Sequence, residues 1–294
     1  MSVTETSSLN KTKARPQARK INWTKVMIYT ILGAFSLSTI LAFAWVIMIS
    51  LKTTTEFLTS NPFSLPKILH FNNYIIGWQQ AQVGTYFGNS VMVATSGAVL
   101  SVLVSALAAY VLARIRFKFT ELFANYFLVG YMIPLMLTFI PLYFMLRGIG
   151  IKNGLIPLVL LYVASGIPFN SFILRGFFES LPSEMEEAAA VDGASPFRTF
   201  WQIMLPLAWP GLVSTFLINF VSLWNEFFLA LVFLKQSQAT LPLGLFYMAQ
   251  SAEYTAQWTY VFAAIIITTV PILIVFALLQ DQITKGMTEG ALKG

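Results

Sequence analysis

The chain has 294 residues, of which 57% are hydrophobic and only 10% are charged. Soluble domains carry about 25% charged residues, so this composition excludes an ordinary soluble domain and indicates an integral membrane protein. Cysteine is absent and His70 is the one histidine, so we expect no disulfide, no metal site and no catalytic site in this chain.

The chain begins with a polar stretch, residues 1–25, that carries six Lys and Arg residues, and we expect a mobile basic tail there. Apolar runs of about 20 residues or more, the length that crosses a bilayer, follow at 26–51, 88–113, 119–146, 154–178, 203–234 and 260–283. The first run is too long for a signal peptide and has no clear cleavage site, so it is interpreted as a retained signal anchor. The sequence predicts an all-α, polytopic membrane protein with a six-helix domain over residues 26–283 and a short tail over 284–294.

The distribution of Lys and Arg predicts the orientation in the membrane. Six spans place both termini on one side, and 13 of the 18 Lys and Arg residues belong to that side. Because cytoplasmic loops carry the excess of Lys and Arg, we expect both termini and the loop 179–202 in the cytoplasm. The loop 52–87 is then external. We expect short interfacial helices in it, and it either meets an external partner or only places aromatic residues at the membrane surface.

The loop between the fourth and fifth spans is rich in carboxylates. Ser183 followed by Glu186 predicts a capping box at the start of a helix, and the following alanines favour that helix. Gly193 fits the left-handed position that ends a helix, and Ser195–Pro196 fits an N-cap followed by proline at the first helical position. The loop 183–198 is therefore predicted to be a helix, a sharp elbow and a second helix.

Two interpretations of this loop stand side by side. It is either a well-capped surface helix or a surface on which another protein docks. The spacing from Glu187 to Pro206 reads E-A-A-x3-G-x9-I-x-L-P, which resembles the cytoplasmic loop by which permease subunits of bacterial ABC importers engage their ATPase. The segments 87–90 (FGNS), 224–227 (WNEF) and 285–294 (KGMTEGALKG) are similar to motifs of the carbohydrate group, typified by the maltose-importer permease. The resemblance covers roughly residues 25–294.

The resemblance implies a set of partners and a location. A second related permease would complete the pathway for a sugar or oligosaccharide, a homodimeric cytoplasmic ATPase would drive it, and an extracellular or periplasmic solute-binding protein would deliver the cargo. The chain would lie in the lipid bilayer of a bacterial inner or cytoplasmic membrane, with no nucleic-acid partner. No G-x-x-x-x-G-K-[ST] segment occurs in it, so ATP and Mg would be bound by the ATPase and this chain is not an enzyme.

Two groups of candidate site residues follow. Carried over from the resemblance, the ATPase-coupling residues are Glu187, Ala188, Ala189, Asp192, Gly193, Ile203 and Pro206, although Asp192 could simply be solvated. The pathway candidates are Asn219, Ser222, Trp224, Asn225 and Glu226.

Glu226 is the one acidic residue that lies away from the ends of a predicted span, and such a residue is a functional candidate. It could instead pair with the second permease or cap a local network. The side chains of Trp224, Asn225 and Glu226 point in directions about 100° apart around the axis of a helix, so they cannot all face one ligand. Asn219, Ser222 and Asn225, at i, i+3 and i+6, share a face.

Other functions remain as alternatives. A secondary transporter usually has several embedded ionisable residues and internal repeats, and this chain has one embedded carboxylate and no visible repeat. An importer permease for a glycerophosphate-type solute would need arginine along the pathway, and none lies in the middle of a span.

Overall fold

The computed structural model describes residues 23–80 and 82–291. Most of the predicted basic tail 1–25 lies outside the described residues. The chain divides into two units, residues 1–45 and 46–294. In the first unit the described part belongs to α1 (Trp23–Ser50), whose apolar side chains are exposed on all sides through Phe43. A helix that is apolar all round suits a lipid environment.

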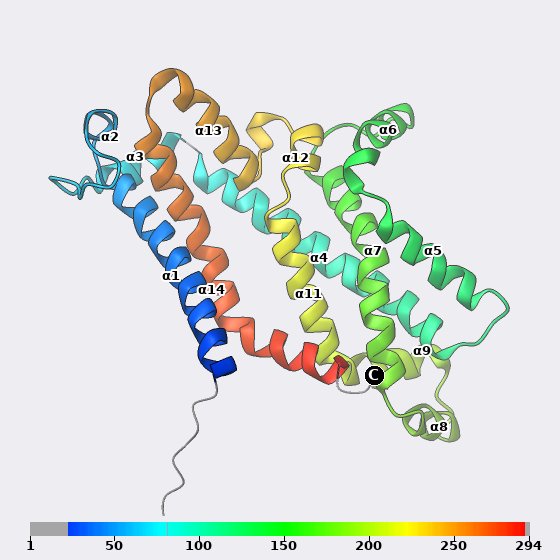
Figure 1. Cartoon of the computed structure of the whole chain (residues 1–294). Helices are drawn as coiled ribbons and strands as arrows, with labels where there is room; N and C mark the ends of the chain where they lie inside the picture. The colour runs from blue at the N-terminus through cyan, green and yellow to red at the C-terminus, as the bar shows by residue number, and fades with distance from the viewer. Residues whose placement is uncertain (1–22, 81, 292–294) are drawn as a thin grey trace, which may run out of the picture. The chain divides into compact units, whose positions relative to one another are not determined.

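The second unit contains all other elements (Figure 1). They are α2 (Thr54–Thr59), α3 (Asn72–Gln80), α4 (Val83–Arg114), α5 (Thr120–Met132), α6 (Leu135–Gly148), α7 (Leu155–Ser180), α8 (Glu184–Val191), α9 (Pro196–Thr199), the π-helical turn η1 (Phe200–Met204), α10 (Leu205–Leu207), α11 (Trp209–Trp224), α12 (Phe228–Phe233), the 3-10 turn η2 (Gln236–Gln238), α13 (Leu241–Thr255) and α14 (Trp258–Ala291). The described residues contain no strand, so the predicted all-α class is confirmed.

Among the described residues, four helices are long and apolar enough to cross a membrane: α1, α4, α7 and the 258–278 part of α14. The third and fifth predicted spans are not single straight helices. The α5–α6 pair bends by 99°, and residues 196–207 and 209–224 form a second pair that bends by 74°. The first break lies at Pro134, which has no N–H to donate and disfavours helix at the residue before it.

Two predicted boundaries also need correction. The fifth span was expected to continue to residue 234, but α11 ends at Trp224 and the short α12 follows after a break. The predicted C-terminal tail 284–294 was expected to lie outside the helices, but α14 continues through Ala291.

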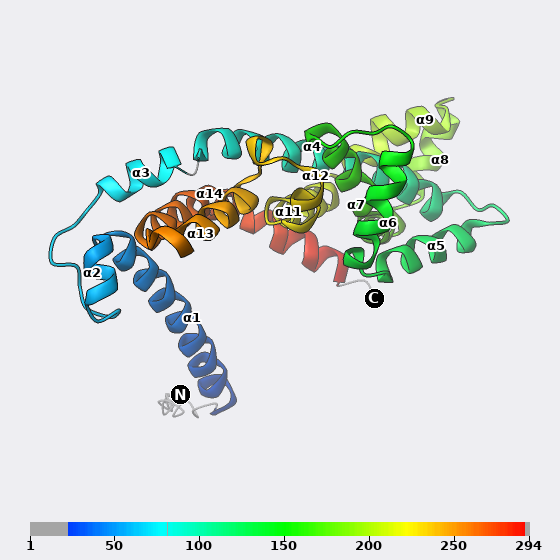
Figure 2. The ribbon, with the colours of Figure 1, turned by 90° about the horizontal axis from the view of Figure 1, so that it is seen from above.

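The centre of the second unit is the contact between α4 and α7. Figure 1 and Figure 2 both show α5 beside α7 as well. The α4 face toward this centre is made of small buried residues: Ser90, Ala94, Gly97, Ala98, Ser101, Ser105, Ala106 and Ala109. Small side chains let two helix backbones approach closely in a membrane. Ser101 Oγ donates to the Val163 carbonyl at 3.2 Å, and Ser105 Oγ donates to the Ile167 carbonyl at 3.4 Å.

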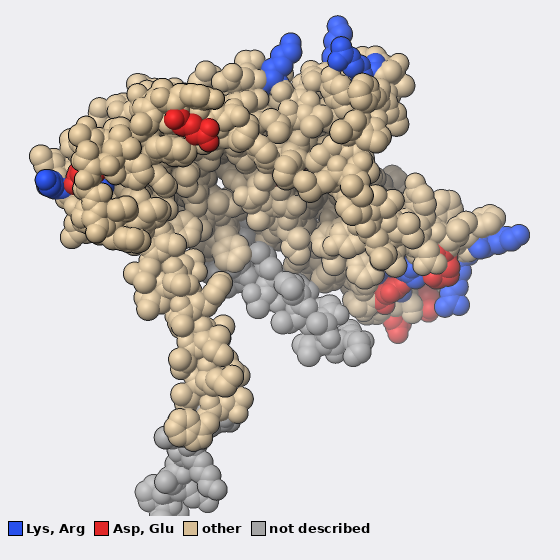
Figure 3. All heavy atoms as spheres, turned by 45° about the horizontal axis from the view of Figure 1, so that its top comes forward, with Lys and Arg blue, Asp and Glu red and all other residues tan. Residues whose placement is uncertain are grey.

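Charged residues are sparse on the surface. On the face shown in Figure 3, the described Lys, Arg, Asp and Glu side chains gather in a few small groups, and broad areas without charge separate them. An uncharged surface of this extent is expected where the helices face hydrocarbon.

The segment after α1 folds around a buried cation. The Lys52 side chain is fully buried, and its Nζ donates to the Asn61 carbonyl and to Ser64 Oγ, both at 3.2 Å. Asn73 Nδ2 donates to the carbonyls of Ser50 and Lys52, both at 2.8 Å. The short helices predicted in the loop 52–87 are present as α2 and α3, which confirms that prediction. The contacts of Lys52 and Asn73 hold the segment between these two helices.

Changing Lys52 to Ala should loosen this loop, because the Asn61 carbonyl and the Ser64 hydroxyl lose a charged donor that contributes about 2 kcal/mol. Amide hydrogen exchange over residues 53–71 should become faster by about tenfold or more. Lys67→Ala is the matched control, because the Lys67 side chain is exposed. Equal exchange in both variants would show that the buried ammonium does not hold the loop.

Candidate functional site

The helix α8 is ended by Gly193, two residues after Val191, in the manner the sequence predicts. Gly193 has a φ of +78°, in the left-handed region. Its N–H donates to the Ala190 carbonyl at 3.1 Å, and the Ala194 N–H donates to the Ala189 carbonyl at 2.9 Å. These two bonds define a Schellman motif. The predicted helix stop is confirmed, and the chain turns sharply after it. We call residues 183–198 the elbow.

The second helix of the elbow also begins as predicted. Ser195 is the N-cap of α9, its side chain accepts from the Arg198 N–H at 3.4 Å, and Pro196 follows it. The helix then passes into the π-helical turn η1, in which the Leu205 N–H donates to the Phe200 carbonyl. Sequence reasoning missed this turn. The available signal was Pro206, two residues after the turn, since proline interrupts the regular helical bonds.

The predicted capping box is wrong. Ser183 has helical dihedral angles, with φ −71° and ψ −24°, and its side chain caps nothing. Glu186 turns instead toward α4, where Tyr110 Oη donates to Oε1 at 2.8 Å and Arg114 Nε lies 3.3 Å from Oε2. The Arg114 contact has the distance of an ion pair but not the direction of a hydrogen bond. A charged partner stabilises a carboxylate more than a neutral backbone N–H does. Glu186 therefore contacts Arg114 and does not bond to the backbone N–H of a capping box.

Further contacts fix the elbow to the ends of α4 and α7. Arg114 Nη2 donates to the Leu181 carbonyl. The Tyr110 ring lies 5.6 Å from the Phe178 ring and 5.1 Å from the Phe200 ring. These aromatic residues belong to a buried cluster, the elbow core, made of Val102, Ala106, Ala109, Tyr110, Leu174, Phe178, Phe200, Met204, Ala208 and Leu212. These contacts connect the elbow to both long helices.

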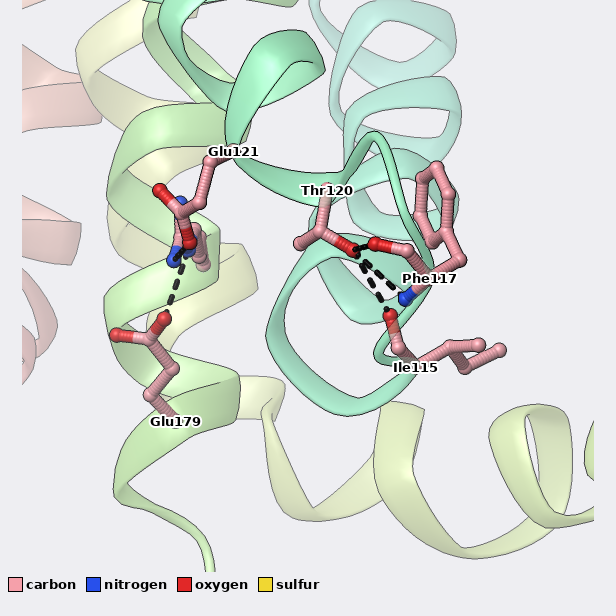
Figure 4. A network of polar contacts seen from close by, with 6 residues as sticks. Ile115, Phe117, Thr120, Glu121 and Glu179 are labelled. Atoms are coloured by element: carbon pink, nitrogen blue, oxygen red, sulfur yellow. Dashed lines mark hydrogen bonds and ion pairs between the residues drawn. The ribbon is translucent and has the colours of Figure 1, made fainter.

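An additional network lies on α5 and α7 (Figure 4). Arg175 Nε donates to Glu179 at 2.7 Å, and Arg175 Nη2 lies 3.5 Å from Glu121 at the start of α5. Thr120 Oγ1 accepts from the Phe117 N–H at 3.0 Å and closes the turn between α4 and α5. The beginning of α5 is thus attached to the last turns of α7.

The structure divides the predicted coupling residues into an exposed set and a packed set. Glu187, Ala188, Asp192 and Gly193 are exposed on the elbow, whereas Ala189 is 4% exposed. Ile203 packs against the elbow core. Pro206 is exposed and lines an apolar groove of about 710 Å³ between α4 and α11. The two packed residues, Ala189 and Ile203, position the elbow.

The exposed set has the chemistry of a docking surface. Glu187 forms no ion pair with a described residue, and Arg198 on the second helix of the elbow donates to Gln202 at 2.8 Å. On the same elbow, Val191, one turn after Glu187, is 88% exposed and Phe197 is 70% exposed. Exposed apolar side chains together with a charge are typical of a protein contact. Sequence reasoning did not single out Val191 or Phe197.

Glu226, the embedded carboxylate, has three donors within this chain. Tyr162 Oη donates to its Oε2 at 2.8 Å, and the N–H groups of Leu229 and Ala230 donate at 2.7 and 3.1 Å. The carboxylate therefore caps α12 where the fifth span is broken. This is the local network that the sequence left open as an alternative to a place on the pathway.

The remaining pathway candidates occupy different environments. Trp224 is 7% exposed and packs against Phe87 and Phe220, with ring centroids 5.9 and 5.7 Å away. Ser222 and Asn225 are exposed, whereas Asn219 is buried. The three polar residues at i, i+3 and i+6 thus do not share one environment.

Asn219 belongs to a buried polar cluster around Gly166 on α7. Asn170 Nδ2 donates to Ser101 Oγ at 2.8 Å. A Cβ added at Gly166 would lie 2.4 Å from Ser101 Oγ and 3.2 Å from the side-chain nitrogens of Asn170 and Asn219. Three helices thus bring polar atoms to one point where only glycine fits.

Comparison with known proteins identifies the chain. Residues 102–289 match the family described as the binding-protein-dependent transport system inner membrane component. The chain belongs to this family. Its members are transport subunits of ABC importers, called permeases, so this permease is a membrane-embedded component of a transporter and is not itself an enzyme.

Relatives resemble this permease over most of their length. The diacetylchitobiose uptake system permease protein NgcG of Streptomyces coelicolor is 40% identical over 266 residues, which cover 90% of this chain and 88% of the relative. A second such protein of that organism, DasC, is 34% identical over 85% of this chain and 90% of its own. A bacterial ABC transporter involved in the import of the acidic polysaccharide alginate has the same fold, with a TM-score of 0.77 and 22% identity over 91% of this chain and 99% of that one.

The link between the permease elbow and α4 can be tested by a double-mutant cycle. Tyr110→Phe and Glu186→Ala each remove one side of the same hydrogen bond, so their effects on thermal unfolding of the permease should not add. We expect a coupling free energy of about 0.5–3 kcal/mol. Glu184→Ala is the control, because Glu184 is exposed at the start of α8. Additive effects of Tyr110→Phe and Glu186→Ala would contradict the link.

Proposed function

We propose that this permease forms half of the translocation pathway of an importer for a sugar or oligosaccharide, and that its elbow docks on a separate cytoplasmic ATPase. The observation that carries the coupling is Glu187, which is exposed and has no ion-pair partner among the described residues. The exposed Val191 and Phe197 lie on the same elbow, which is fixed to α4 and to the end of α7. A second related permease completes the pathway. A homodimeric ATPase binds ATP and Mg, and a solute-binding protein outside the membrane supplies the cargo.

The orientation follows from the distribution of Lys and Arg. Both termini and the elbow lie in the cytoplasm, because cytoplasmic loops carry the excess of these residues. The names of the relatives support a carbohydrate cargo, since NgcG and DasC are both diacetylchitobiose uptake permeases.

In this mechanism the elbow transfers motion from the ATPase to the membrane-spanning helices. Closure of the ATPase dimer on ATP displaces the elbow, and the Tyr110–Glu186 and Arg114–Leu181 contacts pass this displacement to α4. The elbow core passes it to α7 through Phe178. A ligand shifts such an equilibrium only by its difference in affinity for the two states. The docked ATPase must therefore contact the elbow differently when it is open and closed.

Uptake by intact cells tests the proposal. Cells that express the permease should accumulate labelled N,N′-diacetylchitobiose, and cells from which it is deleted should not. Vanadate should block this uptake, whereas an ionophore that collapses the ion gradient should leave it in place while ATP lasts. Uptake that is lost with the ionophore and resists vanadate would exclude an ATPase-driven importer.

Glu187→Arg should reduce uptake by about tenfold or more, because it reverses a charge on the docking surface at a cost of at least ~1.4 kcal/mol. Co-purification of the ATPase should weaken in parallel. Glu184→Arg makes the same charge reversal on the same helix, outside the predicted coupling residues, and should reduce uptake less. Normal uptake by Glu187→Arg would show that Glu187 does not contact the ATPase.

A further inference from the structure

A polar pocket lies at the end of the second unit opposite the elbow. It has a volume of about 310 Å³ and is lined by Gln80, Gln82, Tyr86, Gln236, Gly244, Tyr247, Met248, Ser251, Ala252, Thr255, Gln257 and Val261. These residues come from α3, the start of α4, η2, α13 and the start of α14. Along α4, Tyr86 in the pocket and Tyr110 at the elbow are roughly 36 Å apart at the rise of an α-helix. The pocket is thus distinct from the coupling site.

The lining is polar but carries no charge. Four of its side chains are primary amides, and Ser251 and Thr255 add hydroxyl groups. Among the described residues, none of the four glutamine amides has a hydrogen-bond partner, so their donors and acceptors are available to a ligand. Uncharged groups that both donate and accept match a ligand with many hydroxyl or amide groups.

One wall of the pocket is aromatic. The Tyr86 side chain is 4% exposed and lies against Gly244, where an added Cβ would come within 2.1 Å of its ring. Glycine at this position is therefore required for α13 to pack on the ring. Tyr247 lines the pocket from the neighbouring turn of α13. An aromatic wall together with amide side chains is the kind of lining that holds the face of a sugar ring and bonds its hydroxyl groups.

Two backbone positions at the pocket are unusual. Gln82, with φ 47°, and Ala256, with φ 57°, are the only non-glycine residues with positive φ in the described part of the chain. Gln82 lines the pocket, and Ala256 lies between Thr255 and Gln257, which also line it. Such conformations cost free energy and cluster where a ligand site is formed.

We propose that this pocket is a binding subsite for a neutral saccharide on the outer side of the permease. The inference deepens the carbohydrate function proposed above and rests on it. The volume is at the lower end of the ~300–1,000 Å³ typical of ligand pockets, so the subsite holds a terminal segment of the cargo. No lysine or arginine lines the pocket, so a saccharide that carries carboxylates would lose hydration without gaining a partner.

The test uses the full-length permease in lipid nanodiscs and saturation-transfer NMR. The probe is N,N′-diacetylchitobiose, and an alginate disaccharide is the anionic counterpart. The ring protons of the neutral sugar should receive saturation from the protein, and those of the anionic sugar should receive much less. In a Gln236→Ala/Gln257→Ala double variant the affinity obtained by titrating this signal should fall by about fivefold or more, as expected when two neutral hydrogen bonds are lost.

Gln250→Ala is the matched control, because Gln250 is an exposed amide on α13 that does not line the pocket. It should keep the full signal, and thermal unfolding of all variants should coincide. An equal loss in Gln250→Ala, an equal signal from both sugars, or no signal from either would overturn the subsite.

The two proposals fail separately. Vanadate-sensitive uptake of the sugar without saturation transfer to it removes the subsite and leaves the importer. The opposite outcome is saturation transfer that depends on Gln236 and Gln257 with uptake that resists vanadate. It would support the subsite and exclude the ATPase-driven importer.

Discussion

A permease with valine at position 193 should lose about nine-tenths or more of its uptake, whereas one with asparagine should keep most of it. Gly193 has a φ of +78°. A left-handed conformation costs roughly 1–2 kcal/mol in a residue with a side chain, and a β-branched residue is a genuine outlier there. Asparagine tolerates this region because its short side chain can bond locally. The elbow would therefore lose its angle in the valine variant and keep it in the asparagine variant.

The choice of position isolates the backbone effect. No atom lies within 4 Å of an added Cβ at Gly193, so neither variant creates a clash. Uptake and co-purification of the ATPase should fall together in Gly193→Val, while the thermal unfolding of the spans stays close to wild type. If valine and asparagine reduced uptake equally, the left-handed turn would not be what the elbow requires.

Gly166→Val should strongly destabilise the whole permease. The first added carbon already lies 2.4 Å from Ser101 Oγ and close to the amides of Asn170 and Asn219. Overpacking of this kind costs about 1–3 kcal/mol, and the displaced amides would lose hydrogen bonds in addition. The unfolding temperature in detergent and the yield of folded protein should both fall.

Gly176→Val is the matched control for this change. Gly176 lies on the same helix, and nothing lies within 4 Å of its added Cβ. Both variants exchange glycine for valine within α7, so only the neighbours differ. An equal loss of stability in both would place the effect in the α7 backbone and not in the contact between α4, α7 and α11.

The features predicted correctly from the sequence are local ones. The stop at Gly193 and the start at Ser195–Pro196 depend on residues within one or two turns, and the structure confirms both. The capping box failed because Glu186 bonds to Tyr110, which is 76 residues away in the chain. A pattern of neighbouring residues cannot predict a bond to a partner that far away in the chain.

The breaks within the spans were harder to predict. Hydropathy locates apolar runs but does not distinguish a straight helix from a bent pair, so the breaks at Pro134 and after Trp224 were missed. The coupling and pathway residues remain predictions. The polar pocket was not foreseen, because its lining comes from five segments whose proximity only the fold reveals.

The serine hydrogen bonds between α4 and α7 show the relative direction of these two helices, and this direction limits how the chain can pass from one to the other. Ser101 bonds to Val163, and Ser105, one turn further, bonds to Ile167. The residue numbers rise together, so the two helices are parallel. Parallel neighbours that both span a bilayer must be joined by an odd number of crossings.

The bent pair α5–α6 is the only helical segment between α4 and α7. Its start is attached to the last turns of α7 through Arg175 and Glu121, while α7 itself begins at the other end. If α4 and α7 both span the bilayer, the pair must make one complete crossing despite its 99° bend, because a re-entrant hairpin that returned to its own side could not join two parallel spans.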